Sequence, residues 1–327
     1  MNWKRVLPIA LIAIVVIGAA AGIYIGLKPQ KVGIAIHDMS DPVAKEYALV
    51  LQEELKAQGY VVTVEDAKND QSLQNAQIEK WAKKKYAAVI VSPVMVSAAS
   101  ETVEIVNQAN VTIIFIHKPV SFAALAAWDK VSYVGNTINV WGKCLGDAVL
   151  GLPNEGDING DGVVSYLLVQ DNPENIQKKG GTNALLQTLQ TGEKAVKEIK
   201  QITTNAMESE SSSLCAQAIA QYGKDIEVVI CDSEASVLGA MQAIQEGGRV
   251  VGGDIYLVST ADTQQVFTEV AKGKITAVVH RDFGTLAQKT AEALKLFLND
   301  QTTEQRYLID CVTLTGENAV SYLTFAE

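Results

Sequence analysis

The chain lacks the features that mark most catalysts and nucleic-acid-binding proteins. It has 27 lysine and arginine residues against 37 aspartate and glutamate residues, so its formal net charge is −10 at pH 7. This acidic balance argues against a nucleic-acid partner, because such partners bind basic surfaces. The sequence contains no Gly-x-Ser-x-Gly, Gly-x-x-x-x-Gly-Lys-Ser/Thr or His-Glu-x-x-His motif. Nothing in it therefore indicates a serine hydrolase, a P-loop NTPase or a zinc peptidase, and we do not expect an enzyme.

Cysteine and histidine are also scarce. The four cysteines lie far apart and lack metal-ligand spacing: Cys144, Cys215, Cys231 and Cys311. We expect buried free thiols, with a disulfide as an alternative that the spacing cannot assign. The three histidines, His37, His117 and His280, each follow a predicted strand. There they fit the lining of a polar cleft better than a metal or acid–base role.

One long hydrophobic run lies at the N-terminus. Lys4 and Arg5 precede an uncharged stretch over residues 6–27, and this order is typical of an export signal or a membrane anchor. About 20 apolar residues can span a bilayer, which favours an anchor, whereas residues 19–21, all alanine, offer a cleavage site. No cysteine follows the run to carry a lipid. We expect the rest of the chain to lie outside the cytoplasm, in the periplasm or on the outer face of the cell membrane.

From residue 31 onward, short β-branched runs alternate with longer amphipathic segments. This alternation predicts an α/β fold with two doubly wound parallel-sheet lobes joined by a hinge. Strands are expected at 32–36, 61–64, 87–91, 111–116, 163–169, 199–203, 226–231, 250–253 and 275–279. Helices are expected at 42–58, 70–85, 97–109, 173–191, 209–222, 234–246, 261–272 and 284–299.

Polar residues follow most of the predicted strands. Ligands of such sheets bind beyond the carboxyl ends of the strands, so these residues are candidates for a binding site. Each could instead be a helix N-cap, which favours the same residue types. Their presence in both halves of the chain indicates a cleft lined for a small polar molecule.

Residues 157–165 have the pattern of a calcium-binding loop. Oxygen-bearing side chains occupy alternate positions, Gly162 permits the sharp bend, and Val163 offers its carbonyl. The side chains are those of Asp157, Asn159, Asp161 and Ser165. The twelfth position is Leu168 within an apolar run, so an EF-hand is disfavoured and the final carboxylate must come from elsewhere. The alternative is a simple polar turn, since Asp, Asn and Gly favour turns for backbone reasons.

Several motifs resemble those of type I periplasmic binding proteins, and of the glucose/galactose-binding members in particular. They are Lys-Val-Gly-Ile-Ala-Ile at 31–36, Ile-Phe-Ile-His-Lys-Pro at 114–119, Tyr-Val-Gly at 133–135, the loop at 157–162, Ile226–Ile230, Leu238–Ala240, Gly252–Asp254 and Gly273–Ala277. The resemblance spans roughly 31–315. It implies a signal or anchor over 1–30, an N-terminal lobe of 31–138 plus 282–306, and a C-terminal lobe of 139–281 plus 307–327.

The resemblance also implies site residues. Glu227 matches the distant carboxylate that completes the calcium shell. Eight residues match ligand-contact positions: Asp41, His117, Asn172, Glu174, Lys178, Ser233, Asp254 and Arg281. The aromatic rings that clamp a sugar are replaced by Val43 and, approximately, Glu208. Lys118, Lys178 and Arg281 leave room for a ligand with a carboxylate or another acceptor-rich group.

The expected function is a solute receptor that closes over a monosaccharide or sugar derivative. Its partner would be an ABC importer permease or, given the possible anchor, a sensor kinase. Lactose-type transcription repressors use the same two-lobed core. That function is excluded, because the hydrophobic run occupies the place where a helix-turn-helix would be needed.

Overall fold

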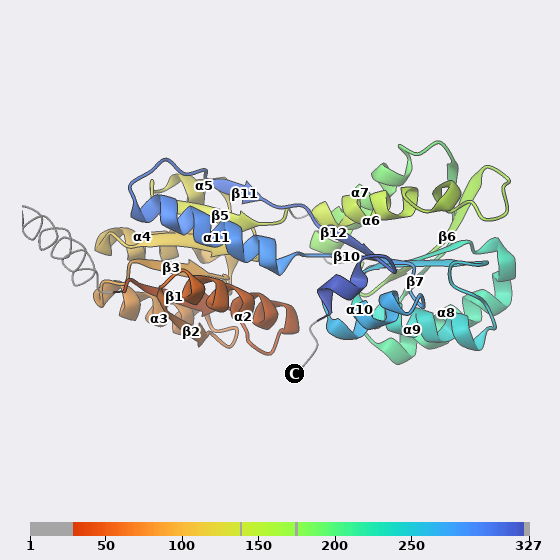
Figure 1. Cartoon of the computed structure of the whole chain (residues 1–327), viewed down its shortest axis with the longest axis horizontal. Helices are drawn as coiled ribbons and strands as arrows, with labels where there is room; N and C mark the ends of the chain where they lie inside the picture. Colours follow the sequence, from red (N-terminus) through yellow and green to blue (C-terminus); the bar gives the residue numbers. More distant parts are fainter. Residues whose placement is uncertain (1–28, 138, 174–175, 324–327) are drawn as a thin grey trace, which may run out of the picture. The chain divides into compact units, whose positions relative to one another are not determined.

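The structure is a computed structural model that describes residues 29–137, 139–173 and 176–323 (Figure 1). The chain forms two compact units. Unit 1 ends at Tyr133 and resumes over Ala287–Arg306, and unit 2 comprises Val134–Leu286 and Tyr307–Glu327. The first two lobe boundaries expected from the sequence lie a few residues away from the corresponding boundaries between the two units. The predicted signal or anchor falls almost wholly outside the described residues, within which no helix has the length and apolar character needed to cross a bilayer.

Unit 1 is built on a six-stranded sheet in the order β11-β5-β4-β3-β1-β2. The strands are β1 (Lys31–Ile36), β2 (Val61–Asp66), β3 (Ala88–Val91), β4 (Thr112–Ile116), β5 (Val131–Gly135) and β11 (Arg306–Leu308). β1 pairs in parallel with both β2 and β3, and β3 with β4. The strand order reverses between β1 and β3, and such a reversal opens a crevice at the carboxyl ends of the two strands.

Helices cover the sheet of unit 1 (Figure 1). One face packs against α3 (Gln71–Lys83), α4 (Ala99–Ala109) and α5 (Phe122–Ala126). The short 3₁₀ turn η2 (Val96–Ala98) directly precedes α4. The fully buried Trp81 and Phe115 lie in this layer. α2 (Pro42–Ala57) contacts β1 and β2, and α11 (Phe283–Leu298) lies beside it. The buried hydroxyls of Tyr47 and Thr290, 3.2 Å apart, join these two helices.

Unit 2 repeats the pattern with the order β12-β10-β9-β8-β6-β7. Its strands are β6 (Val163–Gln170), β7 (Ala195–Thr203), β8 (Val228–Cys231), β9 (Tyr256–Thr260), β10 (Ala277–His280) and β12 (Val312–Thr315), of which only β12 is antiparallel to its neighbour among the pairs described. α6 (Val140–Leu150) and α7 (Ile176–Leu189) cover one face, and α8 (Glu208–Tyr222), α9 (Glu234–Glu246) and α10 (Gln264–Ala271) cover the other. Three short turns complete the unit: η3 (Pro153–Gly156), η4 (Gly223–Asp225) and η5 (Ala319–Tyr322).

The predicted doubly wound α/β architecture is confirmed, and one predicted strand is wrong. Residues 250–253 do not form a strand, because residues 252–254 turn, with Gly252 at φ +78°, and only a single bridge joins Val251 to Ile255. The strand of this region is β9, which starts six residues later than predicted. Helix α10 accordingly begins at Gln264 instead of residue 261, which leaves Asp262 in the loop that follows β9.

Candidate ligand-binding site

Two histidines and a serine meet at the carboxyl edge of the sheet in unit 1. His37 follows β1, Ser92 follows β3 and His117 follows β4. Ser92 Oγ lies 2.9 Å from His37 Nδ1 and 3.3 Å from His117 Nδ1. The two imidazole rings stack with centroids 5.2 Å apart. Three neighbouring strands therefore present one hydrogen-bonded array at the reversal point of the sheet.

Asp41 joins this array from the start of α2. Its Oδ1 accepts hydrogen bonds from the N–H groups of Val43 and Ala44, and its Oδ2 lies 3.3 Å from His37 Nε2. Burial alone would raise the pKa of Asp41, but the hydrogen bonds from His37 and the backbone outweigh it and hold the pKa well below its usual range. Asp41 is therefore an ionised, half-buried acceptor at neutral pH.

Lys118 lies beside the same array. Partial burial lowers the pKa of its ammonium group, while the carboxylates of Asp41 and Asp38 act in the opposite direction. This edge of unit 1 thus combines a fixed carboxylate with basic groups. Such a set can both donate hydrogen bonds to a polar ligand and accept them from it.

In unit 2, Asp262 contacts His280, the last residue of β10, and forms an ion pair with Arg281, which follows it. Its Oδ1 accepts from the backbone N–H of Arg281 at 2.9 Å and lies 2.9 Å from His280 Nδ1. Its Oδ2 accepts from Arg281 Nε at 2.8 Å and also from Nη2. Burial would raise the pKa of Asp262, yet Arg281 and His280 lower it to about 2. The carboxylate is therefore charged and the guanidinium is held in one orientation.

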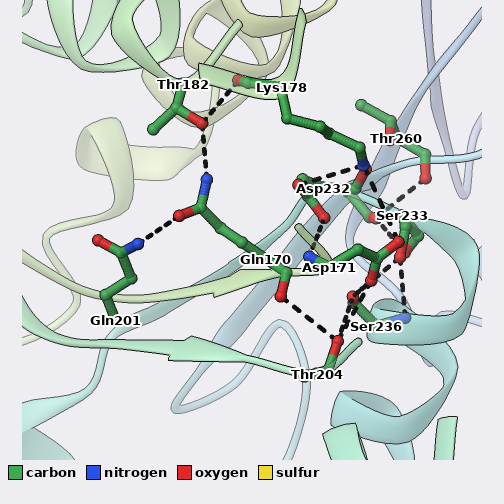
Figure 2. A network of polar contacts seen from close by, with 11 residues as sticks. Gln170, Asp171, Lys178, Thr182, Gln201, Thr204, Asp232, Ser233, Ser236 and Thr260 are labelled. Carbon is green, nitrogen blue, oxygen red and sulfur yellow. Dashed lines mark hydrogen bonds and ion pairs between the residues drawn. The ribbon is translucent and has the colours of Figure 1, made fainter. Parts of the chain in front are cut away.

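A second network in unit 2 centres on Lys178 of α7 (Figure 2). Its ammonium donates to the carbonyl of Asp232 at 2.8 Å, and lies 3.1 Å from Asp232 Oδ2 and 3.9 Å from Asp171 Oδ2. Asp171 follows β6 and Asp232 follows β8, so both carboxylates lie at the carboxyl edge. Burial raises the pKa of Asp232, an effect that Lys178 opposes. Apart from this ion pair, Asp232 Oδ2 has no hydrogen-bond partner among the described residues.

Hydroxyl groups complete the network around Asp171. Its Oδ1 accepts from Ser236 Oγ at 2.7 Å and from Thr204 Oγ1 at 3.2 Å, and Ser236 Oγ lies 2.8 Å from Ser233 Oγ (Figure 2). Ser233 also caps α9 by accepting from the N–H of Ser236. The network is largely satisfied by its own members, which fixes its rotamers before any ligand arrives.

The residues expected from sequence are distributed unevenly. Asp41 and His117 lie together in unit 1, and Lys178, Ser233 and Arg281 lie at the carboxyl edge of unit 2. Asn172 is exposed in the loop after β6, and Glu174 falls outside the described residues. The residues that were not named as ligand contacts from the sequence include Ser92, Asp171, Asp232 and Asp262.

Asp254 does not belong with these residues. It precedes β9 by two positions and so lies at the amino edge of the sheet, where its Oδ1 accepts from the N–H of Val250 at 2.9 Å and its Oδ2 lies 3.6 Å from Arg249 Nε. The aspartate that follows the strand is Asp262. The run Tyr-Leu-Val-Ser-Thr at 256–260, directly before Ala-Asp-Thr, was the signal that could have identified it.

The loop over residues 157–165 has the turns of a calcium loop, with a different use of its carboxylates. Asp157, which is 2% exposed, accepts from the N–H groups of Gly160 and Gly162 at 2.7 and 3.0 Å. Asn159 Oδ1 accepts from the N–H of Asp161, and Asp161 Oδ1 from that of Val163. Gly160 and Gly162 have φ of +77° and +86°, which suits glycine.

Glu227 reaches this loop, as the resemblance implied. Its two carboxylate oxygens accept backbone hydrogen bonds from Ile158, Asn159 and Ser165 at 2.8, 2.9 and 3.0 Å. Among the described residues, no three His, Cys, Asp or Glu side chains come together in a way that could hold a metal ion. The oxygens are thus of the right kind for calcium, but they are directed at backbone N–H groups. Calcium binding by this loop stays a prediction.

All four cysteines are free thiols. Three are buried, and Cys311 is partly buried against the cluster that contains Cys144. A hydrogen bond from Cys311 lowers the pKa of the Cys144 thiol to about 7, against the effect of burial. Burial raises the pKa of Cys215 to about 11 and that of Cys231 well above its usual value.

Comparison with known proteins places this arrangement in a family. A D-galactose/methyl-galactoside binding periplasmic protein of Haemophilus influenzae is 22% identical over 67% of this chain and 68% of its own length. The ribose import binding protein of Escherichia coli is 20% identical over 95% of this chain and 98% of its own.

Solved structures show the same fold. A solute binding protein from Actinobacillus succinogenes with bound D-allose has a TM-score of 0.71 at 15% identity, over 90% of this chain and all of that one. A myo-inositol binding protein from Caulobacter has a TM-score of 0.66 at 17% identity, over 90% of this chain and 98% of that one. The family model described as a periplasmic binding protein domain matches residues 32–302. The chain therefore belongs to the periplasmic binding protein domain family.

Proposed function

We propose that the protein is an extracytoplasmic receptor that binds a small polyhydroxylated molecule, a monosaccharide or sugar derivative, and delivers it to an ABC importer. The family consists of solute-binding proteins, not enzymes, and implies a location outside the cytoplasm. The observation that carries the proposal is the pair of oriented carboxylates at the carboxyl edges of the two sheets, Asp41 and Asp262. Each is ionised and fixed by a basic neighbour.

These groups suit the chemistry of a sugar hydroxyl, which donates one hydrogen bond and accepts others. An ionised carboxylate accepts the donated bond, and a neighbouring guanidinium or imidazole donates the other. The Asp262–Arg281 pair offers both functions from one rigid unit, and Asp41 with the histidine array offers them in unit 1. Hydrogen bonds to charged groups contribute about 1.5–3 kcal/mol each.

The names of the relatives support a compact polyol ligand. The proteins that resemble this chain are described as binding D-galactose, ribose, D-allose and myo-inositol. These molecules share closely spaced hydroxyl groups. Here the basic set of Lys118, Lys178 and Arg281 extends the range to sugar acids, because a carboxylate can accept bidentate hydrogen bonds from a guanidinium.

We further propose that the receptor works by hinge closure, with the ligand favouring a closed form. A ligand that makes more contacts in a closed form than in an open one shifts the population towards the closed form. A permease that recognises only the closed form would then receive the ligand. The hydrogen-bonding groups need no catalytic step for this role.

Calorimetric titration with D-galactose, D-ribose, D-allose, myo-inositol and galacturonate tests the proposal. We expect one of these compounds to bind, and Asp41→Asn and Asp262→Asn each to weaken its binding by about tenfold or more, the equivalent of one charge-assisted hydrogen bond. Asp254→Asn is the matched control, because Asp254 lies at the amino edge, and it should leave the affinity unchanged. If none of the five compounds binds, or if the control loses as much affinity as the other two variants, the proposed site is wrong.

A further inference from the structure

We infer that the loop over residues 157–165, called here the Asp-Asn loop, is closed by the protein's own cations in place of a bound metal, with Lys194 as the counterion of Asp157. The inference concerns the amino edge of unit 2 and is independent of the proposed ligand. It is an alternative to the calcium site expected from the sequence, and the two can be distinguished by experiment.

The first observation is the surroundings of Asp157. Its carboxylate is buried and already accepts two backbone hydrogen bonds from the glycines of the loop. The ammonium of Lys194 lies 3.6 Å from Asp157 Oδ2. The charge of Asp157 is thus compensated without an added ion.

The second observation is that the backbone fixes Lys194 in this place. Lys194 is the residue directly before β7, whose first residue, Ala195, pairs with Val163 and donates its N–H to the carbonyl of Gly162 at 3.1 Å. The carboxylate of Glu155 accepts from the N–H groups of Glu193 and Lys194 at 2.9 and 3.1 Å. The lysine side chain is therefore directed at the loop by the sheet register and does not arrive there from a mobile surface segment.

The third observation concerns Glu227, the second buried carboxylate. The three backbone N–H groups of Ile158, Asn159 and Ser165 use three of the roughly four lone-pair sites of this carboxylate. Bidentate coordination of an ion, as the closing Glu of an EF-hand provides, would therefore require breaking hydrogen bonds that close the loop. Arg249 interacts electrostatically with Glu227, and its Nη1 is anchored on the carbonyls of Gly223 and Ile226, both at 2.8 Å. Each buried carboxylate of the loop region thus has a fixed cationic neighbour.

Together these contacts disfavour a divalent cation. Calcium sits about 2.3–2.6 Å from its oxygen ligands, so an ion on Asp157 would lie close to the Lys194 ammonium. Two like-charged groups at that separation repel each other strongly in a partly buried site. Removal of the lysine charge should make Ca²⁺ binding favourable, because the Asp157 carboxylate in the calcium-type loop would then lack its positively charged neighbour.

Thermal unfolding of the full-length protein in CaCl₂ and in EDTA tests this inference. We expect the wild-type Tm to be the same in both. Lys194→Gln should lower the Tm in EDTA by several degrees, and added Ca²⁺ should restore part of the loss. Lys197→Gln, at an exposed position of the same strand, should behave like wild type in both solutions.

Two results would overturn the inference. One is a wild-type Tm that rises with Ca²⁺, or one calcium per chain by elemental analysis after dialysis against trace Ca²⁺, because the sequence-based calcium site would then be correct. The other is a Lys194→Gln variant as stable as Lys197→Gln in EDTA. If Lys194→Gln does not fold, Lys194→Arg, which keeps the charge, should retain a calcium-independent Tm. The wild-type calcium measurement decides the question in either case.

Discussion

At the scale of single residues, Asp262 shows how burial and pairing act against each other on one carboxylate. Burial disfavours its charge, and the guanidinium of Arg281 with the imidazole of His280 more than offsets this cost. Its folded-state pKa of about 2 lies below the ordinary 3.8. Asp262 therefore contributes stability that is fully present above about pH 4 and is lost as the pH falls through about 2. The contribution amounts to about 2 kcal/mol.

Arg281→Met should remove most of this contribution. We expect the variant to lose about 1–3 kcal/mol of unfolding free energy at pH 7, and the difference from wild type to shrink at about pH 2, where Asp262 becomes protonated in the folded wild type as well. Denaturant unfolding at the two pH values measures this. Arg281→Lys keeps a positive charge and should lose less. A difference of the same size at both pH values would show that Arg281 stabilises the fold by packing and not through Asp262.

At the scale of elements, the sequence predicted the sheets well because β-branched runs bounded by polar residues are a local signal. The site residues found in this way follow correctly predicted strands or open a correctly predicted helix, as His117, Arg281 and Asp41 do. Asp262 was missed because a strand was placed six residues too early, over a glycine turn that ends in Asp254. Asp171 and Asp232 were missed for another reason. Their importance arises from their shared contact with Lys178, which depends on the pairing of β6 with β8.

The meeting of Cys144 and Cys311 is another contact between elements that spacing could not predict. Cys144 belongs to α6 and Cys311 lies directly before β12, elements that pack together in unit 2. The thiol of Cys311 donates to the sulfur of Cys144, which explains the lowered pKa of Cys144, about 7.

Cys311→Ala should raise the pKa of Cys144, because burial then acts without the opposing hydrogen bond. The ultraviolet absorbance of the thiolate, followed against pH, should show one transition near pH 7 in the reduced wild type and none there in the variant. Cys215→Ala is the control and should keep the transition, since burial raises the pKa of Cys215 to about 11. Persistence of the transition in Cys311→Ala would assign it to another group.

At the scale of the whole molecule, the two units share one architecture and differ in what their carboxyl edges carry. Unit 1 presents the histidine array with Asp41, and unit 2 presents two separate ion-paired networks. The sequence predicted the doubly wound fold and a solute-binding family from motifs spread along the chain. It could not identify the ligand, because specificity depends on side-chain geometry and not on the motifs that determine the fold.

The proposed receptor function predicts a change of the whole molecule on binding. Small-angle scattering of the full-length protein should show a smaller radius of gyration at saturating ligand than without it, since the ligand is expected to favour a closed form. The Asp262→Asn variant, at the same ligand concentration, should retain the larger radius. An unchanged radius for wild type at saturation would rule out hinge closure while leaving ligand binding itself intact.

The discontinuity of unit 1 has a consequence for biosynthesis. Its sheet is bordered by β11. In the segment before this strand, the carbonyl of Glu304 accepts a hydrogen bond from Ser132 Oγ, and the carbonyl of Gln305 accepts one from the N–H of Tyr133, both in β5. Helix α11 contacts α2 through Thr290. These contacts cannot form until the ribosome has added residues 287–306, which follow the Val134–Leu286 segment of unit 2. The segment Val134–Leu286 of unit 2 is therefore synthesised before unit 1 can complete its fold. A late closing step of this kind keeps the nascent chain unfolded for longer, and only an unfolded chain can be threaded through a narrow export channel.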